Sequence, residues 1–190
     1  MRIFVVTPPD AVVSLEEAKD HLRVRHDEED ELIRAYVAAA TSHIDGPHGW
    51  LGRAIGVQTL EVRFPAFGTC GWIALPYPPA IDIVSVEYVD DNGASATLDP
   101  EAYETSGGML RPTWPGSFPA AAWRGAAGET VRIQYRAGYE IVPPAIKAAI
   151  LLMVGDLYAN RETVAIGFSV ASVPMSTTVD NLLSPFRAFC

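Results

Sequence analysis

The sequence has few cysteines and no long apolar run, and both shortages exclude classes of protein. Two of the 190 residues are cysteines, and one of these is the last residue, Cys190. Two cysteines are too few for the disulfide framework of a small secreted domain, which favours a reducing compartment. The N-terminal apolar stretch meets Pro8-Pro9 before it reaches the length of a signal peptide. We therefore expect a soluble protein that is not exported and has no membrane partner.

Positive charge is also scarce. There are 14 Lys and Arg against 23 Asp and Glu, which gives a net charge of -9. Proteins that clamp nucleic acid need clustered Lys and Arg to neutralise phosphates, and the sequence has no such cluster. The acidity is compatible with a protein that stands near DNA without holding it. Hydrophobic residues make up 49% of the chain, which is ample for a packed core.

Helical patterns are found before residue 50 and after residue 140. Ser14 and Glu17 have the spacing of a capping box, so a short helix is predicted from there to about Val24. Acidic residues 27–31 favour the start of a second helix, which should end near Gly46. Together these two helices predict a compact hairpin.

A third helix is expected to follow Pro143-Pro144, because proline fits the first turn of a helix. From residue 146 to 157 it is apolar nearly all round, and it is far too short to span a bilayer. We expect it to be buried on more than one side, against the β-region or another subunit.

Between residues 51 and 140, proline and glycine recur every few residues, as is typical of strands and turns. Alternation of polar and apolar residues predicts strands at 58–64, 84–89 and 131–135, and shorter strands are expected at 72–75 and 96–98. Asp90-Asp91-Asn92-Gly93 is a strong hairpin signal.

The fold class expected from these patterns is α+β. A small α-helical bundle of two N-terminal helices and one long helix in the C-terminal half carries an inserted antiparallel β-rich region and an extended C-terminal tail. The expected divisions are a helical hairpin at 1–50, a β-rich insertion at 51–140, a third helix at 141–162 that completes one domain, and a flexible segment with a docking tail at 163–190.

Catalytic and metal-binding patterns are weak. His43, Asp45 and His48 lie close in sequence, but Gly46-Pro47 interrupts the helix that would hold them on one face. Ser169 lies in an incomplete nucleophile-elbow pattern that lacks its last glycine. We therefore expect no enzyme activity, catalytic residue, metal or cofactor. A small metal-dependent hydrolase that uses these four residues remains the alternative from a different class.

Several short patterns keep a particular order along nearly the whole chain. They are Val13–Val24, Asp27–Ile33, Ala38–Ala40, Leu75-Pro76 with Pro78-Pro79, Ile83–Tyr88, Tyr135–Tyr139, Val142–Leu152, Tyr158–Glu162 and Leu182–Arg187. In this order and spacing the chain resembles the head–tail connector, or adaptor, family of tailed bacteriophages and gene transfer agents. The family's usual tail ends in an aromatic residue followed by arginine, whereas this chain continues through Ala188, Phe189 and Cys190.

The resemblance implies a structural protein of the virion or phage-like particle neck, made in the bacterial cytoplasm. It implies a homo-oligomeric ring, commonly a dodecamer, that lies under the portal protein and extends the DNA channel towards the next neck, stopper or tail protein. DNA would pass through without specific binding, because a ring of twelve chains would carry about -108 charges. Another neck component, such as a stopper or tail-completion protein, is the alternative within the same particle.

On this hypothesis, candidate residues can be assigned to the portal-docking surface, to the contacts between subunits of the ring and to the surface that faces the channel. Portal docking is assigned to Leu182, Leu183, Pro185, Phe186 and Arg187. Ring contacts are assigned to Ile146, Ile150, Met153, Leu157, Trp114, Phe118 and Trp123. The acidic residues expected to face the channel are Asp27, Glu28, Glu29, Asp30 and Glu31.

Overall fold

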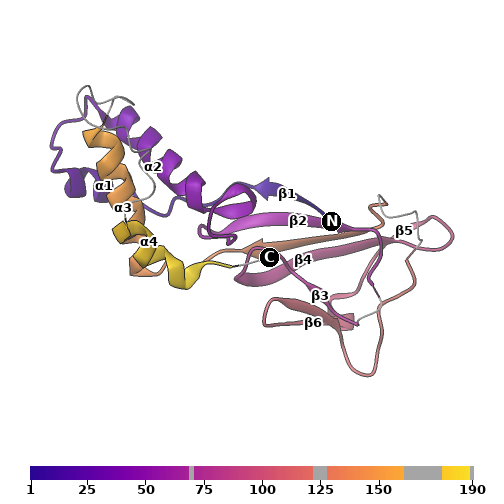
Figure 1. Ribbon diagram of the computed structural model, residues 1–190. Helices are drawn as coiled ribbons and strands as arrows, with labels where there is room; N and C mark the ends of the chain where they lie inside the picture. Colours follow the sequence, from indigo (N-terminus) through magenta and orange to yellow (C-terminus); the bar gives the residue numbers. More distant parts are fainter. Residues whose placement is uncertain (69–70, 122–127, 161–176, 189–190) are drawn as a thin grey trace. The chain divides into compact units, whose positions relative to one another are not determined.

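The chain forms two compact units, each with its own buried residues. A computed structural model describes residues 1–68, 71–121, 128–160 and 177–188. The β unit contains residues 1–10 and 54–140, and the helical unit contains residues 11–53 and 141–188. Figure 1 shows both, with the helices and most of the strands labelled. The expected α+β class is confirmed.

The described part of the helical unit contains four α-helices. They are α1 (Leu15–Leu22), α2 (Asp30–Ile44), α3 (Pro144–Ala159) and α4 (Thr177–Leu183), with short 3-10 turns η1 (Gly46–His48) and η3 (Ser184–Phe186). The predicted capping box is present at α1. The Ser14 hydroxyl accepts from the Glu17 backbone N–H, and the Glu17 carboxylate accepts from the Ser14 N–H at 2.9 Å. Two backbone donors that the helix leaves unpaired are thus satisfied.

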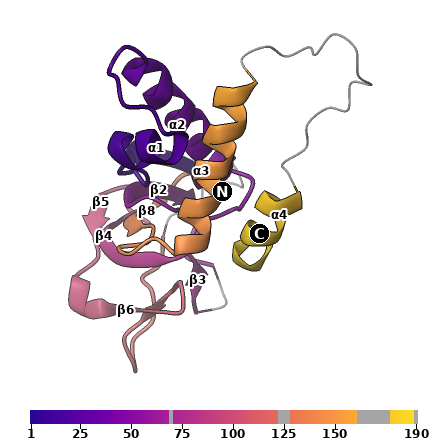
Figure 2. The ribbon, with the colours of Figure 1, turned by 90° about the vertical axis from the view of Figure 1, so that its left-hand side faces the viewer.

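The bundle packs around α3. Helices α1, α2 and α4 each contact α3, and α1 also contacts α2. Figure 2 shows α1, α2 and α3 as neighbouring rods. The fully buried side chains on these helices are Ala18, Ile33, Ile44, Ile146, Ala149, Ile150, Val154, Val179 and Leu183. The predicted third helix therefore gains much of its cover from three other helices of the same chain.

A five-stranded antiparallel sheet is the body of the β unit. Its strand order is β1-β2-β8-β4-β5, from β1 (Arg2–Thr7), β2 (Gln58–Phe64), β8 (Val131–Ala137), β4 (Ala80–Val89) and β5 (Ser95–Thr97). The predicted turn joins β4 to β5. The Asp90 carboxylate accepts from the backbone N–H groups of Asn92 and Ala94, and Gly93 has a φ of +86°. Such a conformation favours glycine because it has no Cβ.

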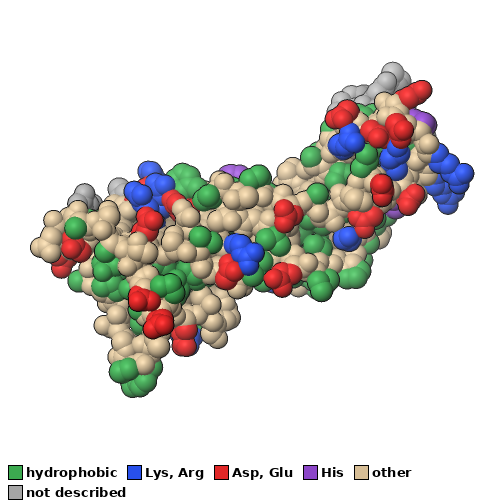
Figure 3. Space-filling model, turned by 180° about the vertical axis from the view of Figure 1, so that it is seen from behind, with side chains coloured by type: hydrophobic (Ala, Val, Ile, Leu, Met, Phe, Trp, Pro, Cys, Tyr) green, Lys and Arg blue, Asp and Glu red, His purple; other side chains and the backbone are tan. Residues whose placement is uncertain are grey.

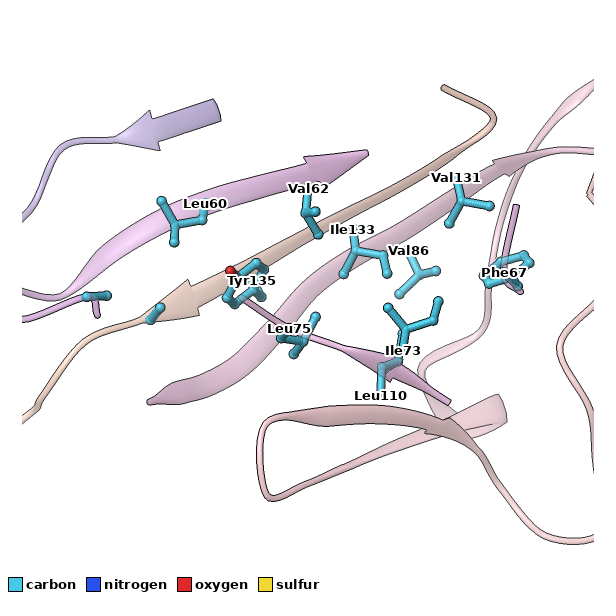
Figure 4. Packing of buried hydrophobic residues seen from close by; sticks show 12 residues of the cluster. Leu60, Val62, Phe67, Ile73, Leu75, Val86, Leu110, Val131, Ile133 and Tyr135 are labelled. Atoms are coloured by element: carbon cyan, nitrogen blue, oxygen red, sulfur yellow. The ribbon is translucent and has the colours of Figure 1, made fainter. Parts of the chain in front are cut away.

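A smaller sheet packs over one face of the first. It has the order β3-β7-β6, from β3 (Ile73–Ala74), β7 (Met109–Pro112) and β6 (Tyr103–Ser106), and the 3-10 turn η2 (Pro100–Ala102) precedes β6. Figure 4 shows the buried side chains between the sheets; they include Leu60, Val62, Val86, Leu110, Val131, Ile133 and Tyr135. In β8 the buried residues alternate with more exposed ones, as the period of two predicted.

Three strands were not predicted, namely β1, β6 and β7. β1 pairs with β2 so that Ile3 lies opposite Val62, and Ile3 packs against the core of the β unit. The helical hairpin expected over residues 1–50 therefore begins only after this strand. The reason is long-range pairing, which a pattern within six residues does not reveal. None of the helices in the described residues is long and apolar enough to cross a membrane.

Candidate docking surfaces

The acidic segment before α2 is tied to the helical hairpin by ion pairs. Lys19 Nζ lies 2.6 Å from Asp27 Oδ1 and 2.7 Å from Asp30 Oδ1. The hydrogen bond from Lys19, together with its positive charge, lowers the pKa of Asp27 below its ordinary value. Lys19 is thus the residue that fixes the connection between α1 and α2.

The other carboxylates of this segment differ in their contacts. Glu31 pairs with Arg34 one turn further along α2, and Glu29 accepts a hydrogen bond from the Tyr158 hydroxyl of α3. Glu28 is exposed and forms no ion pair in the part of the chain that the structure describes. Figure 3 shows acidic and basic side chains mixed over one face of the helical unit. Much of the negative charge of residues 27–31 is therefore balanced by nearby basic side chains.

The four candidate contacts on α3 fall into two groups. Ile146 and Ile150 are fully buried in the helical unit, so the chain itself already covers these two side chains. Met153 is partly exposed, and Leu157 is 37% exposed. As a correction to the sequence-based assignment, only the second pair offers a surface to a neighbour. An apolar helix can be covered by other helices of its own chain or by a neighbouring subunit, and the sequence pattern does not distinguish these two possibilities.

The three aromatic candidates of the β unit also differ. Trp114 is 90% exposed and directly precedes a cis Trp114-Pro115 bond. Phe118 instead stacks on Phe67, with ring centroids 4.8 Å apart, and belongs to the edge of the core. Its side chain is partly exposed, so its assignment as a ring contact stays a prediction. Trp123 lies outside the described residues.

The candidate docking tail packs on its own unit. Leu183 is fully buried, Leu182 and Phe186 are partly exposed, and Pro185 and Arg187 are exposed. The Arg187 guanidinium lies 4.5 Å from the centre of the Trp50 ring. Leu183 is therefore corrected from a docking residue to a core residue of the folded chain, because α4 places it against α3.

A cluster of ion pairs on the outer face of the five-stranded sheet was not predicted. Arg63 donates to Glu129 at 2.6 Å and also to Glu61, and Gln134 donates to Glu61 at 2.8 Å. Burial raises the pKa of Glu61, but the hydrogen bonds from Gln134 and Arg63 outweigh it, and the net pKa is lowered. Alternation along β2 and β8 predicts which residues face outwards, but only the pairing of the two strands brings Glu61, Arg63 and Gln134 together.

The residues of the metal-site alternative are not arranged as ligands. His43 and His48 are exposed, whereas Asp45 is buried at the end of α2. No group of three or more His, Cys, Asp or Glu residues that could hold a metal ion is found among the described residues. Ser169 lies outside them.

A family model described as phage gp6-like head-tail connector protein matches residues 12–64, which span α1, α2, η1 and β2. The expected resemblance to head–tail connector proteins is confirmed. No curated protein matches the chain.

Solved structures extend the similarity over the whole length of the connector-like chain. One similar chain comes from the neck of an empty GTA particle computed with C6 symmetry and another from the virion of a native gene transfer agent particle. Each is 20% identical with a TM-score of 0.76. A chain from the neck of a native GTA particle computed with C12 symmetry is 18% identical, with a TM-score of 0.71. All three alignments cover 100% of this chain and 97% of the other. At this identity the similarity establishes the fold.

Proposed function

We propose that the chain is a structural, non-enzymatic adaptor subunit of a particle neck that joins the capsid to the tail. The observation that carries the proposal is the shared fold over 100% of the chain with proteins solved in particle necks. The connector family match in residues 12–64 supports it independently, because it rests on sequence.

The adaptor is proposed to act as a homo-oligomeric ring of twelve copies beneath the portal protein. The similar necks were computed with C6 and C12 symmetry, and a head-to-tail interface repeated by rotation closes a ring. Met153 and Leu157 on α3 and Trp114 in the β unit are candidate ring contacts, since their side chains are at least partly exposed. Contact with a neighbouring copy would remove these apolar side chains from water.

The ring is further proposed to extend the DNA channel and to meet the next neck, stopper or tail protein. Net charge of -9 in each copy opposes adhesion of a phosphate backbone. Among the five acidic candidates, Glu28 is the best channel residue, because the others in this segment contact Lys19, Arg34, His26 or Tyr158. DNA would then pass without specific binding.

Stopper and tail-completion proteins tend to be β-rich throughout, so a helical bundle as the main body of the chain would favour the adaptor. The structure divides the chain into a helical unit and a β unit of similar length, so this criterion does not decide. The connector family match favours the adaptor. The metal-dependent hydrolase has no support from the comparisons or from the arrangement of His43, Asp45 and His48.

The first experiment measures mass and position. The purified chain is weighed by native mass spectrometry alone and with its portal protein, and intact particles are imaged. A ring bound to the portal, with this chain's fold at the neck, is expected. Density for the chain elsewhere in the particle, or a full-length chain that never associates with portal, contradicts the adaptor role.

The second experiment tests the tail. The double variant Pro185→Ala with Phe186→Ala removes exposed or partly exposed side chains while the buried Val179 and Leu183 stay in place. We expect a folded protein that binds portal-containing particles at least tenfold more weakly, or about 1.4 kcal/mol. Thr178→Ala, an exposed change in α4, is the matched control and should bind normally. Normal binding by the double variant would exclude portal docking through this tail.

A further inference from the structure

The end of the chain is held by four consecutive residues that follow η1. These residues, Trp50 to Arg53, are called the clasp. The backbone N–H of Ala188 donates to the Leu51 carbonyl at 2.8 Å, and Arg53 Nε donates to the Phe186 carbonyl. Two of the contacts therefore recognise the main chain of the tail, so they fix its position whatever its side chains are.

The other two clasp residues complete the fit. The Arg187 guanidinium lies over the Trp50 ring at 4.5 Å, a cation–π arrangement. Gly52 has a φ of +62°, and a Cβ at this position would lie 2.7 Å from the Ala188 carbonyl oxygen. The tail thus approaches the clasp so closely that glycine is required there, and no larger residue fits without displacing the tail.

Upstream of the clasp, the same segment is anchored by its helix. Val179 and Leu183 of α4 are fully buried, and α4 contacts α3. The clasp therefore contacts a segment whose helix α4 is already packed on α3. The buried residues of α4 and the clasp together hold residues 177–188 on the helical unit. This arrangement places the proposed portal-docking residues on their own subunit.

We propose that the clasp is an autoinhibitory contact that holds the tail in the free subunit and must release it when the tail docks on the portal. This inference rests on the proposed function. The Arg187 guanidinium stacks on the Trp50 ring and cannot contact a portal subunit through the same face, so docking through Arg187 requires the clasp to open. The apparent affinity of the chain for the portal is then the intrinsic affinity of the released tail multiplied by the fraction of subunits whose tail is released.

Such a contact would make release of the tail follow the encounter of the subunit with the portal. A free subunit with a clasped tail keeps the Arg187 guanidinium on Trp50, and only a portal surface that binds the tail better than the clasp does can shift the equilibrium. The clasp and the tail lie in one chain, so the clasp acts at a constant effective concentration however dilute the subunit is.

The test uses the full-length chain and the Ala188 amide, whose hydrogen bond to Leu51 reports clasp closure. Gly52→Ala introduces the clashing Cβ. Gly107→Ala is the matched control, since Gly107 has a φ of +59° but no atom within 4 Å of an added Cβ. Both changes strain the backbone to a similar extent, and only Gly52→Ala displaces the tail. Trp50→Ala provides a second clasp variant should Gly52→Ala fail to fold.

In the wild-type chain we expect the Ala188 amide to exchange slowly. In Gly52→Ala or Trp50→Ala it should exchange about tenfold faster, while the Ile133 amide in β8 is unchanged. Binding to portal-containing particles that lack this protein should strengthen in the clasp variants and stay constant in Gly107→Ala.

Two results overturn the proposal: an unprotected Ala188 amide in the wild-type chain, or clasp variants that free this amide and yet bind portal no better than wild type. A wild-type chain with a protected Ala188 amide that never binds portal identifies a different failure. It contradicts the proposed adaptor function, and the release step falls with it, although the clasp contact itself is then verified.

Discussion

Lys19 of α1 and Asp30 of α2 are joined by a hydrogen bond of 2.7 Å between Nζ and Oδ1. Lys19 also binds Asp27 at 2.6 Å, so one ammonium group connects the first helix, the connecting segment and the start of the second helix. Lys19→Met should therefore lower the melting temperature, by no more than a few degrees because such pairs are weakened by solvent. Arg25→Met, on an exposed residue of the same connection, is the control. Equal melting of the two variants, followed by circular dichroism, would refute the role of Lys19.

Stability should fall in acid. The pKa of Glu61 is lowered in the folded chain, with burial opposing the shift and hydrogen bonds from Gln134 and Arg63 producing it. A carboxyl whose folded pKa is depressed contributes stability above its ordinary pKa near 4.5, and this stability is lost as the pH falls through the folded value. Urea midpoints measured from about pH 7 to about pH 3 should decrease below that ordinary value. The decrease should be smaller in Glu61→Gln, and identical pH profiles would contradict this account.

The buried hydroxyl of Tyr135 donates to the Pro76 carbonyl inside the β unit. Tyr135→Phe keeps the ring and leaves that carbonyl without its donor, so the free energy of unfolding should fall by about 1 kcal/mol. Tyr88→Phe, at a partly exposed ring that packs on Phe67, is the control and should change stability by less. Urea titration measures both, and a neutral Tyr135→Phe would show that the hydrogen bond contributes nothing.

Two substitutions on α3 separate core from contact surface. Ile150→Asp buries a charge in the helical unit and should unfold it, at a cost of about 4 kcal/mol or more. Leu157→Asp lies on an exposed position of the same helix and should leave the fold intact while weakening ring formation. Circular dichroism and native mass spectrometry read out the two effects. A folded Ile150→Asp monomer would mean that another subunit, rather than the chain itself, covers this position.

Trp114 is exposed over 90% of its surface, so Trp114→Ala should change the free energy of unfolding by less than about 0.5 kcal/mol. If Trp114 contacts a neighbouring copy, ring assembly should weaken at least tenfold, as measured by light scattering against concentration. Ile141→Ala, at a residue that is 88% exposed and outside the assigned contacts, is the matched control. Normal assembly of Trp114→Ala removes this residue from the ring contacts.

Local features of the fold were readable from the sequence. The Ser14–Glu17 capping box, the limits of β2 and the turn at Asp90–Gly93 were predicted from residues within a few positions of one another, and the structure has each of them. Hydrogen bonds of this kind form between near neighbours, so their signals are complete within a short window. The order of such elements was also enough to indicate the connector family.

Only the tertiary structure decided which surfaces are free. Ile150 and Leu183 have the sequence signature of contact residues, but they are buried because α3 and α4 pack within one unit. β1 became a strand through pairing with β2, more than 50 residues away, and the clasp joined Leu51 to Ala188 across most of the chain. Burial depends on which distant elements meet. A hydrophobic side chain is favoured in an environment without water. Only the folded chain determines whether other residues of the same chain or those of a neighbouring subunit cover it.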